Sequence, residues 1–385
     1  MSAGSLQWSD GAAPHEALWR SEAGLPPPGK VQVADDTLSA DTAYRLACEG
    51  TSFLWRGDFQ NARHLLQALA RRADRKPRKL APPPPSAASA FHLHRQAQGQ
   101  RARVLASVLV PLEGDYTIAL RRAPDLRLAC TEAWGPADGQ SSAVSLRELL
   151  GLVGAHEWRK KGVEIPALGP PPGNRIHPHY GVFSPVRGEY LALISKAALP
   201  STALAFDIGT GTGVIAAVLA RRGVQRVVAT DTDPRAIACA RDNLDRLGVA
   251  SQVELLSADL FPPGRAPLVV CNPPWLPARA TSPVERAIYD QDSQMLRGFL
   301  SGVAAHLEPG GQAWLVLSDL AEHLGLRAPG ELAALIDAGG LKVLGKSTTR
   351  ARHPKAADAS DPLAPARAKE ITTLWRLGAR VEVGR

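Results

Sequence analysis

Hydrophobic and polar residues alternate regularly in the C-terminal half of the chain. Short apolar runs of strand length are separated by stretches in which apolar residues recur at every third or fourth position. The runs predict strands at 203–207, 226–230, 253–257, 268–271, 313–317, 341–345 and 371–377. The stretches between them predict helices at 214–222, 234–247, 291–306 and 330–338. This order is typical of a parallel sheet with helices on both faces, so the half is predicted to be an α/β domain. The last two strands have no helical pattern between them and are predicted to be antiparallel.

The N-terminal half has a less regular pattern. Residues 1–35 are mostly polar, and helical spacing of apolar residues follows over 39–72 and again over 145–161. Ser39 and Asp41 are candidate N-caps for the first of these segments. Residues 103–111 and 115–121 are predicted to be strands. The mixture predicts a smaller α/β or α+β domain.

Two proline-rich stretches divide the chain further. The segment 165–174, IPALGPPPGN, lies between the two patterns and predicts a domain boundary. We therefore expect an N-terminal domain over 1–165, a linker over 166–174 and a C-terminal domain over 175–385. A second stretch, over 71–85, combines a basic run with consecutive prolines and predicts a stiff linker inside the N-terminal domain.

The length and charge of the chain add two expectations. With 385 residues the chain is long enough for two domains. Its net charge of +8 favours anionic partners, nucleic acid first among them. Spread over a chain of this length, the same charge also fits a merely well-solvated surface.

Cysteine usage and hydropathy indicate a cytoplasmic location. The four cysteines are widely spaced, without a CxxC pair, so neither a disulfide framework nor a zinc site is expected. Residues 1–14 lack the apolar core of a signal peptide. No apolar run is long enough to cross a bilayer, so no membrane association is expected.

A glycine-rich loop follows the first strand of the C-terminal domain. It reads Asp207-Ile208-Gly209-Thr210-Gly211-Thr212-Gly213 and opens a predicted helix. Its glycines let the backbone approach a ligand closely, and the helix N-terminus presents free N–H groups. The spacing GxGxG differs from the GxGxxG of dinucleotide binders. Asp207 would repel a pyrophosphate but attract an ammonium group, which disfavours a nicotinamide-dependent oxidoreductase. A purely structural turn between strand and helix is the alternative.

Acidic residues also end the next two strands. Asp231 ends the second strand, where a carboxylate can bind both hydroxyls of a ribose. Asp233 precedes Pro234 and is better explained as a helix N-cap. Asp259 and Leu260 follow the third strand and are predicted to contact an adenine amino group and ring. Each acid alone could be a surface residue, but three at successive strand ends indicate a nucleoside site.

The fourth strand ends in Asn272-Pro273-Pro274-Trp275. This segment resembles the signature of class I methyltransferases that modify planar nitrogens: adenine-N6 and guanine-N2 nucleic-acid enzymes and HemK-like glutamine methyltransferases. The resemblance covers about residues 175–385, and the usual tyrosine or phenylalanine is replaced by Trp275. It implies a Rossmann-like sheet of seven strands, one of them antiparallel. It also implies S-adenosylmethionine bound by Asp207, Gly209, Thr210, Gly211, Gly213, Asp231, Asp259, Leu260 and Asn272.

The chemistry of methyl transfer to such a nitrogen explains the motif. An amide or exocyclic amino nitrogen is a poor nucleophile because its lone pair is delocalised. The Asn272 oxygen and the Pro273 carbonyl can each accept one of its N–H bonds and so localise the lone pair. The two prolines stiffen the loop, and Trp275 could stack on the planar group. Asn272, Pro273, Pro274 and Trp275 are therefore the candidate catalytic residues.

Residues 180–190, YGVFSPVRGEY, lie shortly before the glycine loop. They are similar to the HemK-like segment that covers the cofactor and receives the substrate, in which a Pro-x-x-x-Glu pattern occurs. Pro185 and Glu189 match that spacing. The resemblance implies that Phe183, Pro185 and Glu189 contact the substrate, although Phe183 could equally belong to a core.

These observations predict an S-adenosylmethionine-dependent N-methyltransferase whose N-terminal domain recognises the substrate. A base in nucleic acid, structured RNA above all, is the first candidate substrate because of the motif and the basic charge. A glutamine side chain in a protein such as a release factor is the second. A non-catalytic RNA-binding protein with a vestigial fold is the alternative from another class. No metal is expected, and the sequence does not address the oligomeric state.

Overall fold

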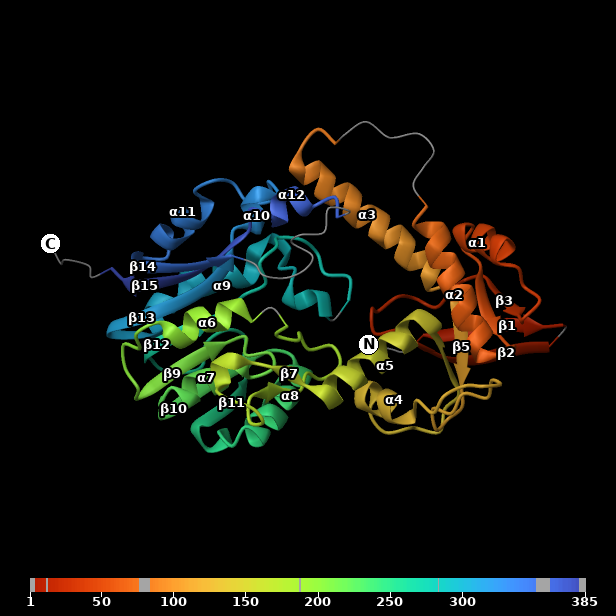
Figure 1. Ribbon diagram of the computed structural model, residues 1–385, viewed down its shortest axis with the longest axis horizontal. Coiled ribbons are helices and arrows are strands. Elements are labelled where there is room, and N and C mark those ends of the chain that lie inside the picture. The colour runs from red at the N-terminus through yellow and green to blue at the C-terminus, as the bar shows by residue number, and fades with distance from the viewer. Residues whose placement is uncertain are drawn as a thin grey trace. The chain divides into compact units, whose positions relative to one another are not determined.

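The structure is a computed structural model that describes residues 4–11, 13–75, 84–186, 188–282, 284–350 and 361–380. Two compact units make up the chain (Figure 1). The first comprises Met1–Pro84 and His92–Glu157, and the second comprises Pro85–Phe91 and Trp158–Arg385. Among the described residues, no helix combines the length and the apolar character needed to span a membrane.

The first unit contains a mixed sheet in which six strands are described, in the order β1-β2-β6-β5-β4-β3. Its strands are β1 (Ser5–Asp10), β2 (Ala13–Arg20), β3 (Val31–Ala34), β4 (Ser52–Trp55), β5 (Val108–Leu112) and β6 (Ser142–Ser145). Its helices are α1 (Ala40–Cys48), α2 (Phe59–Ala73), α4 (Arg127–Trp134) and most of α3 (Ala87–Leu105) and α5 (Leu146–Lys161). Parallel and antiparallel pairs both occur, which confirms a smaller mixed α/β unit.

Local signals account for most helices of this unit. Ser39 caps α1, because its side chain accepts a hydrogen bond from the Thr42 N–H. Asp58 caps α2 in the same way through the Gln60 N–H. The predicted helical segment 39–72 is interrupted by β4, whose four residues are all buried. A short, fully buried strand has no alternation, so its pattern resembles that of a buried helix turn.

Two predicted strands of this unit are wrong or displaced. Residues 115–121 form turns, bends and irregular structure. The Asp115 side chain accepts hydrogen bonds from Thr117, and Tyr116 adopts a left-handed φ of 68°. The predicted strand 103–111 begins inside α3, which ends at Leu105, and β5 follows from Val108.

The second unit is built on a larger sheet. Its strands are β9 (Leu204–Ile208), β10 (Arg226–Asp231), β11 (Val253–Ser257), β12 (Ala266–Cys271), β13 (Leu307–Ser318), β14 (Leu341–Arg350) and β15 (Ile371–Ala379), beside the short pair β7 (Val163–Glu164) and β8 (Arg175–Ile176). Its helices are α6 (Glu189–Lys196), α7 (Val214–Arg221), α8 (Pro234–Arg246), α9 (Gln294–Gly302), α10 (Leu320–His323), α11 (Glu331–Ala338) and α12 (Ala364–Arg367). Short 3₁₀ turns lie at Pro166–Leu168, Ala250–Gln252, Val284–Ala287, Gln291–Ser293 and Val303–His306.

The order of the larger sheet, over its described residues, is β11-β10-β9-β12-β13-β15-β14. β9 to β13 pair in parallel, and β15 runs antiparallel to both of its neighbours. This confirms the predicted Rossmann-like sheet of seven strands with one antiparallel strand. It also confirms the antiparallel pairing of the last two strands.

Alternate residues of the strands face two separate cores. Ala205, Val227 and Val270 pack with helices α6, α7 and α8 on one face. Phe206, Val228 and Val269 pack with α9 and α11 on the other. β9, β10 and β12 are therefore apolar on both sides, which is why each reads as a continuous apolar run in the sequence.

The proline-rich segment expected to act as a linker at 166–174 is packed within the second unit. Leu168 is buried in the core on the α7 face. Asn174 is also buried, and its amide donates a hydrogen bond to the Gly169 carbonyl. Residues 76–83 of the other expected linker lie outside the described residues.

Candidate active site

The register of three neighbouring strands brings three candidate residues together. Ile208 at the end of β9 pairs with Thr230 on β10 and with Cys271 on β12. The residues that come next along the chain are Gly209 directly after β9, Asp231 at the end of β10 and Asn272 directly after β12. Because the carboxyl ends of parallel strands meet at one edge, these residues form a row where ligands bind in this class of sheet.

The glycine loop turns sharply from β9 into α7. Gly209, Gly211 and Gly213 all have a positive φ, of 70°, 55° and 78°. At Gly213 a β-carbon would also lie 3.1 Å from the backbone of Ala240 on α8. The space beside Gly211, in contrast, holds no atom within 4 Å of that position. The loop thus needs glycine for its conformation, and it is open at its centre.

Asp207 lies beneath this loop and is fully buried. Its Oδ2 accepts hydrogen bonds from the Thr210 hydroxyl at 2.7 Å and from the Ala216 N–H at 3.1 Å. Its Oδ1 is buried without a hydrogen-bond partner. Burial raises the pKa of this carboxyl to about 7. Asp207 therefore supports the loop from below and brings a titratable charge under it.

Asp231 tethers the loop to the second strand. Its Oδ2 accepts the Gly211 N–H and its Oδ1 accepts the Asp233 N–H, both at 2.9 Å. Burial raises the pKa of this carboxyl, and these hydrogen bonds act in the opposite direction. Each carboxylate oxygen keeps a further lone pair, so the group can still accept hydroxyl groups. Asp233 caps α8 through the Arg235 N–H, as its sequence position indicates.

The end of β11 is shaped by Leu260. This residue has a left-handed φ of 63°, and its carbonyl accepts a hydrogen bond from the Thr230 hydroxyl at 2.6 Å. Its side chain contacts α9 at Gly298, where a β-carbon would lie 2.7 Å from it. Asp259 beside it is exposed. The strand end is thus held rigidly, with an accessible carboxylate next to an apolar side chain.

Asn272 is held by two aromatic residues. The Trp275 indole donates a hydrogen bond from Nε1 to Asn272 Oδ1 at 2.9 Å. Tyr190 on α6 is buried, and its phenol interacts with the Asn272 side chain. Burial and the Asp207 and Glu189 carboxylates raise the pKa of this phenol, whereas the Asn272 contact lowers it. Pro273 is buried and Pro274 is half-buried, so the loop has a fixed path.

The segment 180–190 ends at Tyr190, the α6 residue that interacts with Asn272. Val182 packs against Ala236 and Cys239 on α8. Pro185 is buried, Phe183 is half-buried, and Glu189 is half-buried at the start of α6. The sequence pattern singled out Phe183, Pro185 and Glu189 for substrate contact. Tyr190, which follows them directly, was missed because its contact depends on the packing of α6 against the sheet.

Met295 was also missed by the sequence analysis. Its methyl group lies against Gly209, where a β-carbon would be 2.5 Å from it. Its N–H donates a hydrogen bond to Asp290. Met295 lies inside the predicted helical segment 291–306, where no short sequence motif distinguishes it from other apolar helix residues. Within the described ranges, no group of three His, Cys, Asp or Glu side chains could hold a metal.

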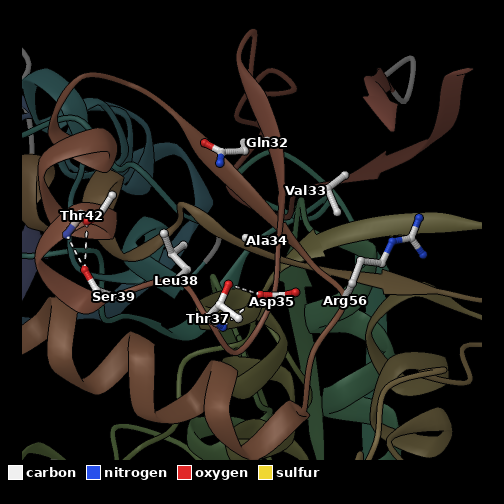
Figure 2. A pocket seen from close by; sticks show the side chains of 9 residues that line it. All are labelled: Gln32, Val33, Ala34, Asp35, Thr37, Leu38, Ser39, Thr42 and Arg56. Atoms are coloured by element: carbon white, nitrogen blue, oxygen red, sulfur yellow. Dashed lines mark hydrogen bonds between the residues drawn. The ribbon is translucent and has the colours of Figure 1, made fainter. Parts of the chain in front are cut away.

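A separate hollow of about 460 Å³ lies in the first unit, at the end of β3 (Figure 2). Asp35 there accepts hydrogen bonds from Thr37, and Ser39 and Thr42 hydrogen-bond each other. These contacts form the turn that starts α1. Arg56 extends from the end of β4 on the other side (Figure 2). The polar groups between β3 and α1 are thus largely engaged in local structure.

Comparison with known proteins shows similarity within the second unit. Residues 173–328 match the family model of the methyltransferase small domain. The chain is 33% identical over 169 residues to a release factor glutamine methyltransferase of Cereibacter sphaeroides, covering 40% of this chain and 58% of that protein. It is 44% identical over 84 residues to a ribosomal protein L11 methyltransferase of Pelotomaculum thermopropionicum, covering 21% and 27%.

Solved structures also match part of this chain. One is a SAM-dependent methyltransferase from Thiobacillus denitrificans in complex with S-adenosyl-L-homocysteine. It is 18% identical, with a TM-score of 0.35, and the match covers 51% of this chain and 92% of that one.

Proposed function

We propose that this chain, whose residues 173–328 are a methyltransferase small domain, transfers a methyl group from S-adenosylmethionine to a planar nitrogen. The observation that supports it best is the row formed by Gly209, Asp231 and Asn272. A glycine loop, a hydroxyl-binding carboxylate and an amide acceptor then lie side by side. Such a row suits a nucleoside-containing methyl donor and an N–H substrate together.

The residues around the loop fit this cofactor. The open space beside Gly211 admits a ligand close to the backbone. Asp231 retains the lone pairs needed to accept two ribose hydroxyls. Asp259 and Leu260 offer an acceptor and an apolar surface for an adenine. The unpartnered oxygen of Asp207 favours a cation above the loop, as the ammonium of the methionine part requires.

Asn272 is proposed to bind and orient the substrate nitrogen. Its oxygen accepts the Trp275 indole on one lone pair, so a second lone pair remains for a substrate N–H. The Pro273 carbonyl is proposed to accept the other N–H of the same group. Both bonds strengthen as the nitrogen becomes positive during methylation, which places their stabilisation in the transition state. S-adenosylmethionine supplies an electrophilic methyl group on its sulfonium.

We propose a side-chain amide of a protein, of the glutamine type, as the acceptor. The named relatives include enzymes for a release factor glutamine and for a ribosomal protein, which are protein substrates. The nucleic-acid base favoured by the sequence analysis is not supported by these comparisons. The chain spans 58% or less of the length of these two relatives.

The first unit is proposed to select the protein substrate, because the second unit contains the whole row of site residues. The four cysteines all carry free thiols, which fits the proposed reducing, cytoplasmic location.

Methyl transfer can be tested with S-adenosylmethionine that carries a labelled methyl group. The full chain is incubated with an extract that contains ribosomes and soluble factors, and the product is then divided between ribonuclease and protease. Label released only by protease, and recovered as methylated glutamine after hydrolysis, supports the proposal. Label released by ribonuclease would instead establish a nucleic-acid substrate. Absence of label with intact cofactor binding would indicate the non-catalytic alternative.

A further inference from the structure

Charge is strongly segregated in the first unit. Helix α2 with the two residues after it, and residues 92–105 of helix α3, carry seven arginines and one acidic residue, Asp74. The arginines are Arg63, Arg71, Arg72, Arg75, Arg95, Arg101 and Arg103. Over residues 1–58 and 106–157, acidic residues outnumber basic ones by fifteen to eight. A net positive charge is thus concentrated on α2 with the two residues after it and on residues 92–105 of α3.

Two of these arginines have a structural role. Arg101 binds both carboxylate oxygens of Asp74, at 2.7 and 3.0 Å, and so ties α3 to the end of α2. Arg72 binds Asp41 on α1 at 2.8 Å. Both side chains are partly buried. Their charges are neutralised by these partners, so they do not explain the excess of arginine.

Three other arginines of these two helices are exposed. Arg71 lies near the end of α2, Arg75 follows Asp74 just after that helix, and Arg103 lies near the end of α3. None of the three forms an ion pair within the described part of the chain, and Arg103 hydrogen-bonds only the neutral Gln100. We call Arg71, Arg75 and Arg103 the α2–α3 arginine surface.

The side chains next to this surface indicate the kind of partner. Gln96, Gln98 and Gln100 are exposed on α3, and residues 92–103 are all exposed or half-buried. Leu93 is the large apolar side chain exposed there. Lipid binding requires a broad apolar face, and protein interfaces require apolar or aromatic anchors at their centre. Arginine with polar hydrogen-bond donors is instead the composition that binds phosphates.

We propose that the α2–α3 arginine surface binds the phosphate backbone of a nucleic acid. Neutralising phosphates releases counterions, so the binding should weaken steeply with salt. This inference does not depend on methyl transfer. If both hold, the protein substrate is presented in an assembly that contains nucleic acid, and the first unit contacts that nucleic acid while the second modifies the protein.

Binding of the full chain to fluorescein-labelled oligonucleotides of about 20 residues tests the proposal, since such a length exceeds a typical single-strand site. Oligouridine RNA and oligothymidine DNA of equal length show whether the surface prefers an RNA or a DNA phosphate backbone. In about 0.1 M KCl, where the Debye length is about 10 Å, Arg71→Glu/Arg75→Glu/Arg103→Glu should lower the affinity at least about tenfold. The slope of log K against log salt should become shallower by about 2 for three lost contacts.

The matched control is Lys30→Glu/Arg56→Glu/Arg265→Glu, which changes the net charge of the chain equally at exposed positions that form no ion pair among the described residues. It should retain most of the affinity and the wild-type salt slope. Equal loss in both variants would show that net charge alone matters and would overturn the proposal. Unchanged affinity in the Arg71→Glu/Arg75→Glu/Arg103→Glu variant would also overturn the proposal. The same holds if the unmodified chain binds phosphatidylserine vesicles or polyglutamate but binds neither oligonucleotide. Should the glutamate variant fail to fold, Arg71→Ala/Arg75→Ala/Arg103→Ala gives the same test.

Discussion

Trp275 donates a hydrogen bond from its indole Nε1 to the side-chain oxygen of Asn272, over 2.9 Å. A phenylalanine or tyrosine ring at position 275 has no N–H group with which to form this bond. The bond fixes the direction in which the Asn272 amide presents its oxygen. Trp275 is therefore a positioning residue for Asn272, in addition to any stacking on the substrate.

Replacing Trp275 by phenylalanine should lower kcat by about twofold to tenfold, which corresponds to the ~0.5–1.5 kcal/mol of a typical hydrogen bond. The aromatic surface remains, so the dissociation constant of the cofactor should not change. Steady-state kinetics and calorimetric titration of the variant measure the two effects. Trp158→Phe, a change at a half-exposed tryptophan of the same unit, is the control. An unchanged kcat in Trp275→Phe would remove the positioning role.

Replacing Asn272 by alanine should reduce turnover by about 10²-fold or more, as loss of one preorganised polar group in a catalytic site does. Cofactor affinity should stay close to that of the wild type, because the loop and Asp231 are untouched. Single-turnover rates with labelled S-adenosylmethionine, beside equilibrium binding, separate the two effects. Asn61→Ala on α2 is the matched change outside the site. Normal turnover in Asn272→Ala would show that another group orients the nitrogen.

Alanine replacements of the neighbouring residues Asp231 and Asp233 should affect two different properties, cofactor affinity and folding stability. Asp231→Ala should weaken cofactor binding by the ~1.5–3 kcal/mol typical of hydrogen bonds to a charged group. Asp233→Ala removes the cap of α8 and should lower the free energy of unfolding by about 1 kcal/mol, with little effect on affinity. Calorimetric titration and denaturant unfolding of both variants test this pair. Equal cofactor affinity in Asp231→Ala and wild type would place the ribose contact elsewhere.

The raised pKa of Asp207, about 7 against 3.8 for an ordinary aspartate, should make stability depend on pH. Between these values the folded chain holds a proton that the unfolded chain releases, so stability falls as the pH rises towards 7. Asp207→Asn lacks this titration. The melting temperature of the wild type relative to Asp207→Asn should therefore be higher at about pH 5 than at about pH 8.

The same carboxyl should control cofactor affinity in the opposite direction. Only its ionised form, present above about pH 7, attracts an ammonium group. Wild-type affinity should therefore rise between about pH 6 and 8, and this rise should be absent in Asp207→Asn. Asp245→Asn, at an exposed position of α8 outside the proposed site, serves as the control for a simple loss of charge. A parallel rise in wild type and Asp207→Asn would exclude Asp207 as its source.

The strands β9, β10 and β12 could be predicted because each is apolar on both faces and leads to Gly209, Asp231 or Asn272, respectively. β11 begins and ends at the predicted residues, and the row of Gly209, Asp231 and Asn272 follows from the strand ends alone. The contacts of Asn272 with Trp275 and Tyr190 could not be predicted, because they depend on rotamers and on the packing of α6. In the first unit, the Asp115 turn competed successfully with the strand propensity of residues 115–121.

The position of β15 in the larger sheet has a consequence for synthesis of the chain. β15 is made after β14, yet it is inserted between β13 and β14 and pairs with both. Until residues 371–379 have left the ribosome, β13 has an open edge and β14 has no neighbour in the sheet. Open edges of this kind invite pairing with other chains. A nascent chain that stops before Ile371 should therefore be recognisable to chaperones and proteases as unfinished, even though every residue of the proposed methyl-transfer site has already been made.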